Sequence, residues 1–262
     1  MTSFTIVTIT FNAADCLART LDSVLRQTHP AVEHLIIDGA SADGTVAMAE
    51  DYKRRSDAAG CGHTVAITSE PDRGLYDAMN KGLARATGDY VCFINAGDAL
   101  AATDTLALLA GLAAEAGQDG RGLPAVLYGD TVITDSEGRC LRPRRLRPPK
   151  RLTWRSFRGG MLVCHQAFYA RTDIARRLPY NLAYKYSADV DWCIRVMREA
   201  ARLGLPLAGT GATVARYMEQ GQTTLHHRES LRERFRVMAS HYGLPLTVAM
   251  HCWFVVRGLF KR

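Results

Sequence analysis

Apolar residues recur along the first hundred positions with two alternating periods. Short runs rich in β-branched and aromatic residues are typical of strands, and they cover residues 4–11, 32–38, 64–70 and 90–95. Between them, apolar residues spaced three and four apart, such as Leu17, Leu21 and Val24, are typical of helices with one buried face. The segments that predict helices lie between Asn12, a candidate N-cap, and Pro30, and at 45–57, 74–86 and 103–116.

This alternation of strands and helices predicts an α/β fold, with a mostly parallel sheet flanked by helices. In such sheets, ligands bind beyond the carboxyl ends of the strands. Each of the four predicted strands is followed by acidic or amide side chains, which are Asn12, Asp38, Glu70, Asp72, Asn95 and Asp98. We therefore expect these side chains to meet at one edge of the sheet.

The pattern is less regular after residue 120. Residues 161–171 predict an extended segment, and the Arg- and Pro-rich stretch 141–151 predicts an irregular loop. The other predicted elements are a hairpin at 125–140, helices at 189–204 and 223–243, and a strand at 212–221. No internal repeat or low-complexity linker divides the chain.

Composition bounds the class of protein without choosing a function. The 262 residues are 47% hydrophobic and 23% charged, as in a folded globular protein. The net charge of +7 is compatible with nucleic acid, an anionic membrane surface or phosphate-bearing substrates. Seven cysteines without CxxC spacing indicate reduced thiols, which are typical of a cytoplasmic protein.

No signal peptide is predicted, because the N-terminal residues have no basic region followed by a long apolar run. No membrane-spanning helix is predicted, because no run of eighteen apolar residues occurs. The C-terminal stretch from Leu246 to Arg262 comes nearest. Its apolar residues and flanking cations fit either a helix at a membrane surface or a helix packed on the core. The basic stretch 141–151 likewise fits either a solvated loop or a contact with an acceptor carried on a lipid diphosphate.

Several catalytic motifs are missing from the sequence. There is no GxxxxGK[ST] phosphate loop, no HExxH and no GxSxG, and GTGATV (209–214) only approximates a dinucleotide-binding GxGxxG. The acids at the strand ends would repel one another unless a cation lies among them. Oxygen ligands suit Mg²⁺ or Mn²⁺, and such ions commonly bridge to substrate phosphates. A metal-bound diphosphate is therefore a natural ligand.

Five blocks in their order resemble the family-2 glycosyltransferases with the GT-A fold. These blocks are TFN (10–12), DGASADGT (38–45), SEPDRGLYDAMNKG (69–82), FINAGD (93–98) and SADVDW (187–192). The resemblance runs from residue 4 to about 200, with GQTTLHHRE (221–229) as a final element. The HQAFYAR stretch (165–171) and the NAGD form are most similar to bacterial enzymes that build exopolysaccharide or lipopolysaccharide, including the colanic-acid type.

The resemblance implies a Rossmann-like GT-A domain and an inverting transfer from a UDP- or GDP-sugar to a glycan or lipid-linked acceptor. Residues 1–120 would bind the nucleotide sugar, and residues 121–222 would form the acceptor and catalytic half. Residues 223–262 would be a helical extension. The enzyme would be cytoplasmic, with a candidate peripheral contact at the inner face of the membrane. No QxxRW motif occurs, so transfer of single sugars is favoured.

The resemblance also implies roles for individual residues. Phe11 would stack on the nucleobase, although a core aromatic is the alternative. Asp189 would be the catalytic base, although Ala188 replaces the Glu that often precedes it. The alternative for both Asp189 and Asp191 is charge at a helix N-terminus, and Asp191 fits that alternative. The nucleotide-sugar contacts would be Thr10, Phe11, Asn12, Asp38, Glu70, Asp72, Asn80 and Asn95.

The last acid of the DxD-type motif, Asp98, would bind Mg²⁺ or Mn²⁺, with His226 or His227 as a further candidate ligand. Asn95 departs from the fully acidic pattern and offers no charge. His165 and Gln166 would line the acceptor side.

Three other functions compete with this interpretation. A non-catalytic nucleotide-sugar or glycan binder is suggested by Asn95 and Ala188. A nucleotidyltransferase is disfavoured because the TITFNAADC segment has no Gly-rich basic loop. A nucleic-acid-binding protein is suggested by charge alone, without a recognition motif.

Overall fold

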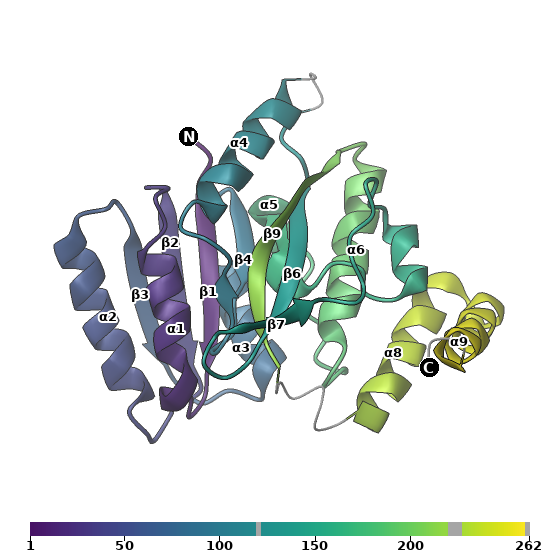
Figure 1. Ribbon diagram of the computed structural model, residues 1–262, viewed down its shortest axis with the longest axis horizontal. Coiled ribbons are helices and arrows are strands. Elements are labelled where there is room, and N and C mark those ends of the chain that lie inside the picture. Colours follow the sequence, from purple (N-terminus) through teal and green to yellow (C-terminus); the bar gives the residue numbers. More distant parts are fainter. Residues whose placement is uncertain (119–121, 220–226, 260–262) are drawn as a thin grey trace.

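The four N-terminal strands pair in parallel at one end of a curled, nine-stranded sheet (Figure 1). In the computed structural model, which describes residues 1–118, 122–219 and 227–259, β1 (Phe4–Thr10) lies between β2 (Val32–Asp38) and β4 (Tyr90–Phe93). The strand β3 (Thr64–Ser69) pairs with the other side of β2. All three pairings are parallel, as the sequence predicts for this half of the sheet.

The register brings the carboxyl ends of these strands together. Thr10 pairs with Asp38, and Asp38 pairs with Ser69. The last residues of β1, β2 and β3 therefore lie side by side at one edge, as expected for three of the four strands.

Strands of mixed direction complete the sheet beyond β4. The order continues through β8, β6, β9 and β5. The short strand β7 also pairs with β6. The contacts β4–β8, β6–β8, β6–β7 and β5–β9 are antiparallel, whereas β6–β9 is parallel. The bounds are β5 (Ala99–Leu100), β6 (Val126–Thr134), β7 (Cys140–Pro143), β8 (Phe168–Arg171) and β9 (Leu207–Met218). One sheet thus joins the predicted halves 1–120 and 121–222, and the division of roles between them stays a prediction.

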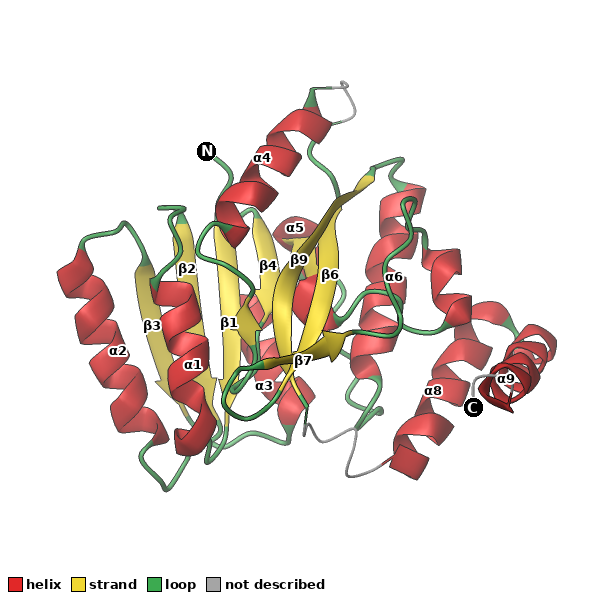
Figure 2. Ribbon diagram, in the orientation of Figure 1, coloured by secondary structure: helices red, strands yellow, loops and turns green. Residues whose placement is uncertain are grey.

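Helices flank this sheet (Figure 2). The α-helices are α1 (Ala14–Leu25), α2 (Thr45–Ala59), α3 (Leu75–Arg85), α4 (Thr105–Gly117), α5 (Thr172–Ala175), α6 (Ala188–Arg202), α8 (His227–Tyr242) and α9 (Leu244–Leu259). Two short 3₁₀ helices, η1 (Trp154–Gly159) and η2 (His165–Ala167), lie between β7 and β8. No helix in these described parts of the chain is long and apolar enough to cross a membrane.

Alternate residues of the parallel strands face opposite layers of helices. Ile36 packs with Leu17 and Leu21 of α1, whereas its neighbour Ile37 belongs to the larger core with α3. The contact with α3 is close, because a Cβ on Gly82 would lie 2.4 Å from Cγ1 of Val7. Glycine at this position therefore lets α3 pack directly on the sheet.

Several local predictions need correction. Only 168–171 of the predicted extended segment forms a strand, because residues 165–167 make η2. Part of the predicted loop 141–151 pairs in β7, and β9 begins at Leu207 rather than at 212. The long predicted helix 223–243 is described from His227 only.

Asn12 does not cap α1 either. The backbone N–H groups at the start of α1 donate to side chains just after β2 instead. Ala13 donates to the Thr45 hydroxyl, and Ala14 donates to the Asp43 carboxylate. All seven cysteines are free, and Cys92 is fully buried as expected of a small core residue.

Candidate functional site

An exposed aromatic ring, a glycine and a carboxylate lie together at the carboxyl edge of the parallel strands. Phe11 is 65% exposed, so it is not the core aromatic that the sequence allowed. Gly39 lies between the other two, since a Cβ there would stand 2.6 Å from Oδ2 of Asp72 and 3.2 Å from the Phe11 ring. An exposed aromatic face and an acid are therefore available at one place on this edge.

Asp38 is buried at this edge and accepts several hydrogen bonds. The hydroxyl groups of Thr10 and Ser69 donate to it over 2.8 and 2.7 Å, and Ser41 donates both its hydroxyl and its N–H. Burial alone would raise the pKa of the Asp38 carboxyl, but the donors from Ser41, Ser69 and Thr10 together lower it. The carboxylate is ionised and held in one orientation.

Asn12 ties the end of β1 to the loop after β2. Its backbone N–H donates to the Ser41 hydroxyl over 2.8 Å, and its side-chain oxygen accepts the N–H of Ala42 over 2.9 Å. Asn12 has a positive φ of 47°, a conformation that asparagine tolerates better than most residues. The two loops around Gly39 are thereby held together.

Two other residues of the predicted nucleotide site have structural partners. Both amide atoms of Asn80 bind the backbone of Tyr180, at 3.0 and 2.7 Å. Glu70 forms an ion pair of 3.0 Å with Lys81, which also donates to the carbonyl of Pro71. Nucleotide contact by Asn80 or Glu70 stays a prediction, and for Asn80 it would require giving up these bonds.

The turn of residues 95–98 is clamped by α1 and places Asp98 inside the protein. The Thr20 hydroxyl donates to the Asp98 carbonyl over 2.6 Å and accepts the N–H of Gly97 over 2.9 Å. The Asp98 carboxylate accepts the side-chain N–H of Gln166 at 2.6 Å and the N–H of Met218 at 2.9 Å. Burial raises the pKa of the Asp98 carboxyl to about 6.

Asn95, His165 and Asp189 form a hydrogen-bonded row across the site. The Asn95 amide nitrogen lies 3.3 Å from Nε2 of His165, and His165 Nδ1 lies 3.3 Å from Oδ2 of Asp189. Because the amide N–H is a donor, Nε2 is the acceptor and the proton of His165 is on Nδ1, facing Asp189. The row joins the end of β4 to the first turn of α6.

Asp189 has further partners that sequence patterns did not predict. The Tyr76 hydroxyl donates to Oδ1 over 3.2 Å, and Tyr76 had only the signature of a buried helix residue. Burial alone would raise the pKa of Asp189, but the hydrogen bond from His165 and the charge of Arg234 lower it. Arg234 lies on α8, where alternating charges resemble an ordinary solvated helix.

The neighbouring acid Asp191 has a structural environment. It is buried and pairs with Arg195 on its own helix at 2.7 Å and with His241 of α8 at 2.8 Å. Asp191 therefore joins α6 to α8, which is a stronger role than the helix charge predicted for it.

The residues of the 95–98 turn fit a divalent cation in two respects. Asp98 carries a buried negative charge without a cationic partner at ion-pair distance in the described ranges, and Oδ1 of Asn95 is buried without a hydrogen-bond donor there. No group of three His, Cys, Asp or Glu side chains comes together among these residues. Mg²⁺ and Mn²⁺ sites often need only one or two protein oxygens beside substrate phosphates, so the turn is compatible with such an ion. His226 and the His227 side chain lie outside what the structure describes.

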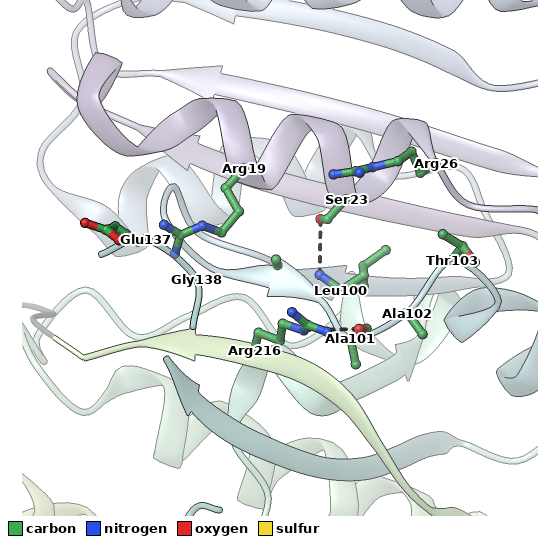
Figure 3. A pocket seen from close by; sticks show the side chains of 11 residues that line it. Arg19, Ser23, Arg26, Leu100, Ala101, Ala102, Thr103, Glu137, Gly138 and Arg216 are labelled. Carbon is green, nitrogen blue, oxygen red and sulfur yellow. Dashed lines mark hydrogen bonds between the residues drawn. The ribbon is translucent and has the colours of Figure 1, made fainter. Parts of the chain in front are cut away.

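Two hollows lie near these residues. One of about 480 Å³ is lined by Tyr76, Tyr184 and Tyr186, next to the Tyr76–Asp189 contact. Another of about 340 Å³ lies among Arg19, Arg26 and Arg216 (Figure 3). No residue of the predicted site lines the second hollow, so it is separate from the site.

Comparisons with known proteins bear on the family and the fold of this chain. Residues 5–178 match the family model described as Glycosyl transferase family 2. A "PGL/p-HBAD biosynthesis glycosyltransferase" of Mycobacterium bovis is 31% identical over 250 residues, which are 94% of this chain and 89% of that protein.

Two solved structures share the fold at lower identity. The complex of S. aureus TarS with UDP is 17% identical with a TM-score of 0.66, over 91% of this chain and 64% of that one. The mannosyltransferase PcManGT from Pyrobaculum calidifontis, solved with GDP-Man and Mn²⁺, is 18% identical with a TM-score of 0.61, over 97% of this chain and 75% of that one.

Proposed function

Because this chain belongs to glycosyltransferase family 2 and has the GT-A fold, we propose that it transfers a sugar, with inversion, from a UDP- or GDP-sugar to an acceptor hydroxyl. The observation that carries the proposal is the row Asn95–His165–Asp189. It connects the turn that holds Asp98 to the acid at the start of α6. A donor diphosphate at Asp98 and an acceptor at Asp189 would therefore face each other across His165.

The base and ribose of the donor would lie at the carboxyl ends of β1, β2 and β3. Phe11 is exposed for stacking, and Asp72 is within reach of the same face. Asp38 is fully occupied by hydroxyl donors, so it can contact a nucleoside only if one of them rotates away. TarS with UDP and PcManGT with GDP-Man support a nucleotide-sugar donor without choosing the base.

Asp189 would act as the general base. Its lowered pKa keeps it ionised at neutral pH, so it can accept the proton of the acceptor hydroxyl as that oxygen bonds to the anomeric carbon. The bond from that carbon to the diphosphate breaks on the opposite side, and its electron pair leaves on the diphosphate oxygen. His165 and Tyr76 keep the Asp189 carboxylate oriented through this single displacement.

Asp98 would hold a divalent metal, with Asn95 beside it. When bound, the metal would supply positive charge that stabilises the leaving nucleoside diphosphate. The deprotonated form of Asp98 is the ligand, so metal binding should strengthen as the pH rises through about 6.

The acceptor would be a glycan or lipid-linked sugar at the cytoplasmic face of a membrane, in surface polysaccharide or glycolipid synthesis. The hollow lined by Tyr76, Tyr184 and Tyr186 supports a sugar acceptor, since aromatic faces suit the apolar side of sugar rings. The missing QxxRW motif favours addition of one sugar at a time.

The test is a thermal-shift screen of UDP- and GDP-sugars with and without Mn²⁺, followed by a turnover assay. We expect one donor to raise the melting temperature, and Gly39→Ala to weaken that shift because its Cβ would displace the Asp72 carboxylate and crowd the Phe11 ring. Gly111→Ala is the matched control, since a Cβ there meets open space on α4.

Loss of the shift in both variants, or no shift with any donor, would contradict the proposed site. Binding without turnover across a broad acceptor panel would instead support the non-catalytic binder, which Asn95 and Ala188 suggest.

A further inference from the structure

The outer face of α9 is apolar from Leu244 to Val256. Leu244 is 58% and Trp253 is 54% exposed, although both are large apolar side chains. The exposed positions of this face are Leu244, Pro245, Val248, Ala249, Cys252, Trp253 and Val256. Their spacing of one, three and four places them on one side of three helical turns, and none is polar or charged.

The other face of α9 already holds the helix on the protein. Thr247 is buried, and the His251 ring contacts Phe235 of α8 and Phe254 at centroid distances of 4.9 and 5.5 Å. The apolar outer face is therefore not needed to attach α9 to the fold. The sequence alone did not separate the two faces, since it offered the stretch from Leu246 to Arg262 as a whole as either a surface helix or a core helix.

Basic side chains lie beside this apolar face. The 3₁₀ helix η1 lies against α9 and carries Arg155 and Arg158. It is attached to the end of α8, because the Tyr242 ring stacks on Trp154 at 5.6 Å and its hydroxyl donates to the Trp154 carbonyl. Residues 150–158, which lead into and form η1, contain four Lys or Arg and no Asp or Glu, whereas Arg142 and Arg147 earlier in the chain pair with Glu219 and Asp130.

We infer that the outer face of α9, with η1 beside it, docks on an anionic lipid surface. Apolar side chains that enter the lipid boundary and cations that meet anionic headgroups reinforce each other in such a contact. A second copy of this chain would bring the same positive charge against itself, so self-association is disfavoured. The apolar face lies along the surface of the protein, which fits an interfacial helix.

The inference deepens the proposed function, and its link to a lipid-borne acceptor rests on that function. Glu233 of α8 accepts the N–H groups of Lys185, Tyr186 and Ser187 at 2.7, 2.7 and 3.0 Å. These residues lead directly into α6 and Asp189. Docking through α9 would therefore fix the direction in which the site approaches the membrane.

Vesicle flotation of the full chain tests the docking surface without any sugar transfer. We expect binding to vesicles with 30% phosphatidylglycerol and little binding to pure phosphatidylcholine. The triple variant L244S/V248S/W253S should lower the partition coefficient at least tenfold. L108S is the matched control for an exposed leucine, because Leu108 is 44% exposed on α4, and it should bind as the wild type does.

The basic contribution is tested with R151Q/R155Q/R158Q on the same vesicles. Each cation near an anionic surface contributes about fivefold, so the triple change should weaken binding on the order of a hundredfold. K53Q/R54Q/R55Q removes the same charge from α2 at the opposite end of the molecule (Figure 1) and should have little effect.

If R151Q/R155Q/R158Q and K53Q/R54Q/R55Q bind the vesicles equally, then binding depends on net charge alone. That result would overturn the proposed surface. Absence of vesicle binding, or concentration-dependent dimers in sedimentation that L244S/V248S/W253S abolishes, would also overturn it. Donor thermal shifts measured without vesicles report on the proposed function separately, so the two failures can be told apart.

Discussion

Asp189 and Asp191 lie two positions apart on α6, yet their surroundings differ in kind. Asp189 faces His165 and Tyr76 at the site, whereas Asp191 is held by Arg195 and His241. The first arrangement orients a carboxylate beside the hollow that Tyr76 lines, and the second neutralises a buried charge. This contrast provides a matched pair of substitutions.

Asp189→Asn should lower kcat by about 10²–10⁴-fold while donor binding and the melting temperature change little, because only the proton acceptor is lost. Asp191→Asn should instead destabilise the protein by about 2 kcal/mol, since Arg195 and His241 lose a buried partner. Turnover and thermal unfolding of both variants check this. Unchanged turnover in Asp189→Asn would remove it from the mechanism.

At the same scale, Asn95 has a physical reason to be an amide. Its N–H group can donate to His165 Nε2, so the single ring proton is on Nδ1 and faces Asp189. A carboxylate at position 95 would place His165 between two acids and add negative charge beside Asp98.

We therefore expect Asn95→Asp to bind Mn²⁺ about tenfold more tightly and to lower kcat, with little change in the melting temperature. Titration calorimetry with Mn²⁺ measures the affinity. Asn181→Asp is the control for an added surface charge, since Asn181 is exposed. Equal Mn²⁺ affinity in wild type and Asn95→Asp would contradict a metal at this turn.

At the scale of elements, one buried histidine joins β1, β2 and α2. His34 lies fully buried between the Thr8 hydroxyl at 2.8 Å and the Tyr52 hydroxyl at 2.7 Å. Burial, with a smaller contribution from the charge of His63, lowers the pKa of His34 from 6.5 to about 3. Sequence periodicity shows an inward position on a strand, but not these two partners.

This histidine should make the fold sensitive to acid. The unfolded chain takes up a proton near pH 6.5, whereas folded His34 does so only near pH 3, so stability is present above pH 6.5 and is lost as the pH falls. The free energy of unfolding should drop by about 2 kcal/mol between pH 7 and pH 5 from this group. Urea unfolding of His34→Gln at both values should lack that part of the loss; an identical loss would assign it elsewhere.

The elements with strong periodicity were predicted well. The local predictions that needed correction share one cause, which is contact with a distant segment. β1 to β4 and α1 to α4 follow from alternating burial, which each segment records in its own residues. The cap of α1 was wrong because Asp43 and Thr45 supply it from thirty positions away. β5 has only two residues, and its pairing with β9 has no local signature.

At the scale of the molecule, α8 links the outer helix α9 to the site. Glu233 accepts three backbone N–H groups from residues 185–187, just before Asp189. One carboxylate therefore holds the approach to α6 against α8.

Glu233→Ala should destabilise the protein by about 2 kcal/mol, because three N–H groups lose a charged acceptor. We expect kcat to fall while donor affinity is kept, since the donor edge is built from β1 to β3. Hydrogen exchange of residues 185–187 should rise in parallel. Glu229→Ala, an exposed acid one turn earlier, is the control; slower exchange or a weaker donor affinity would count against this role.

The sequence by itself determined the parallel strands, the edge where Asp38 and Asp98 are delivered, and the family to which the blocks belong. These follow from burial patterns and motif order, which are properties of short segments. The tertiary structure decided that Phe11 is exposed, that Asn80 binds Tyr180, and that Tyr76 reaches Asp189 across 113 positions. Such contacts depend on how helices pack on the sheet, and packing between distant segments leaves no periodic trace in either one.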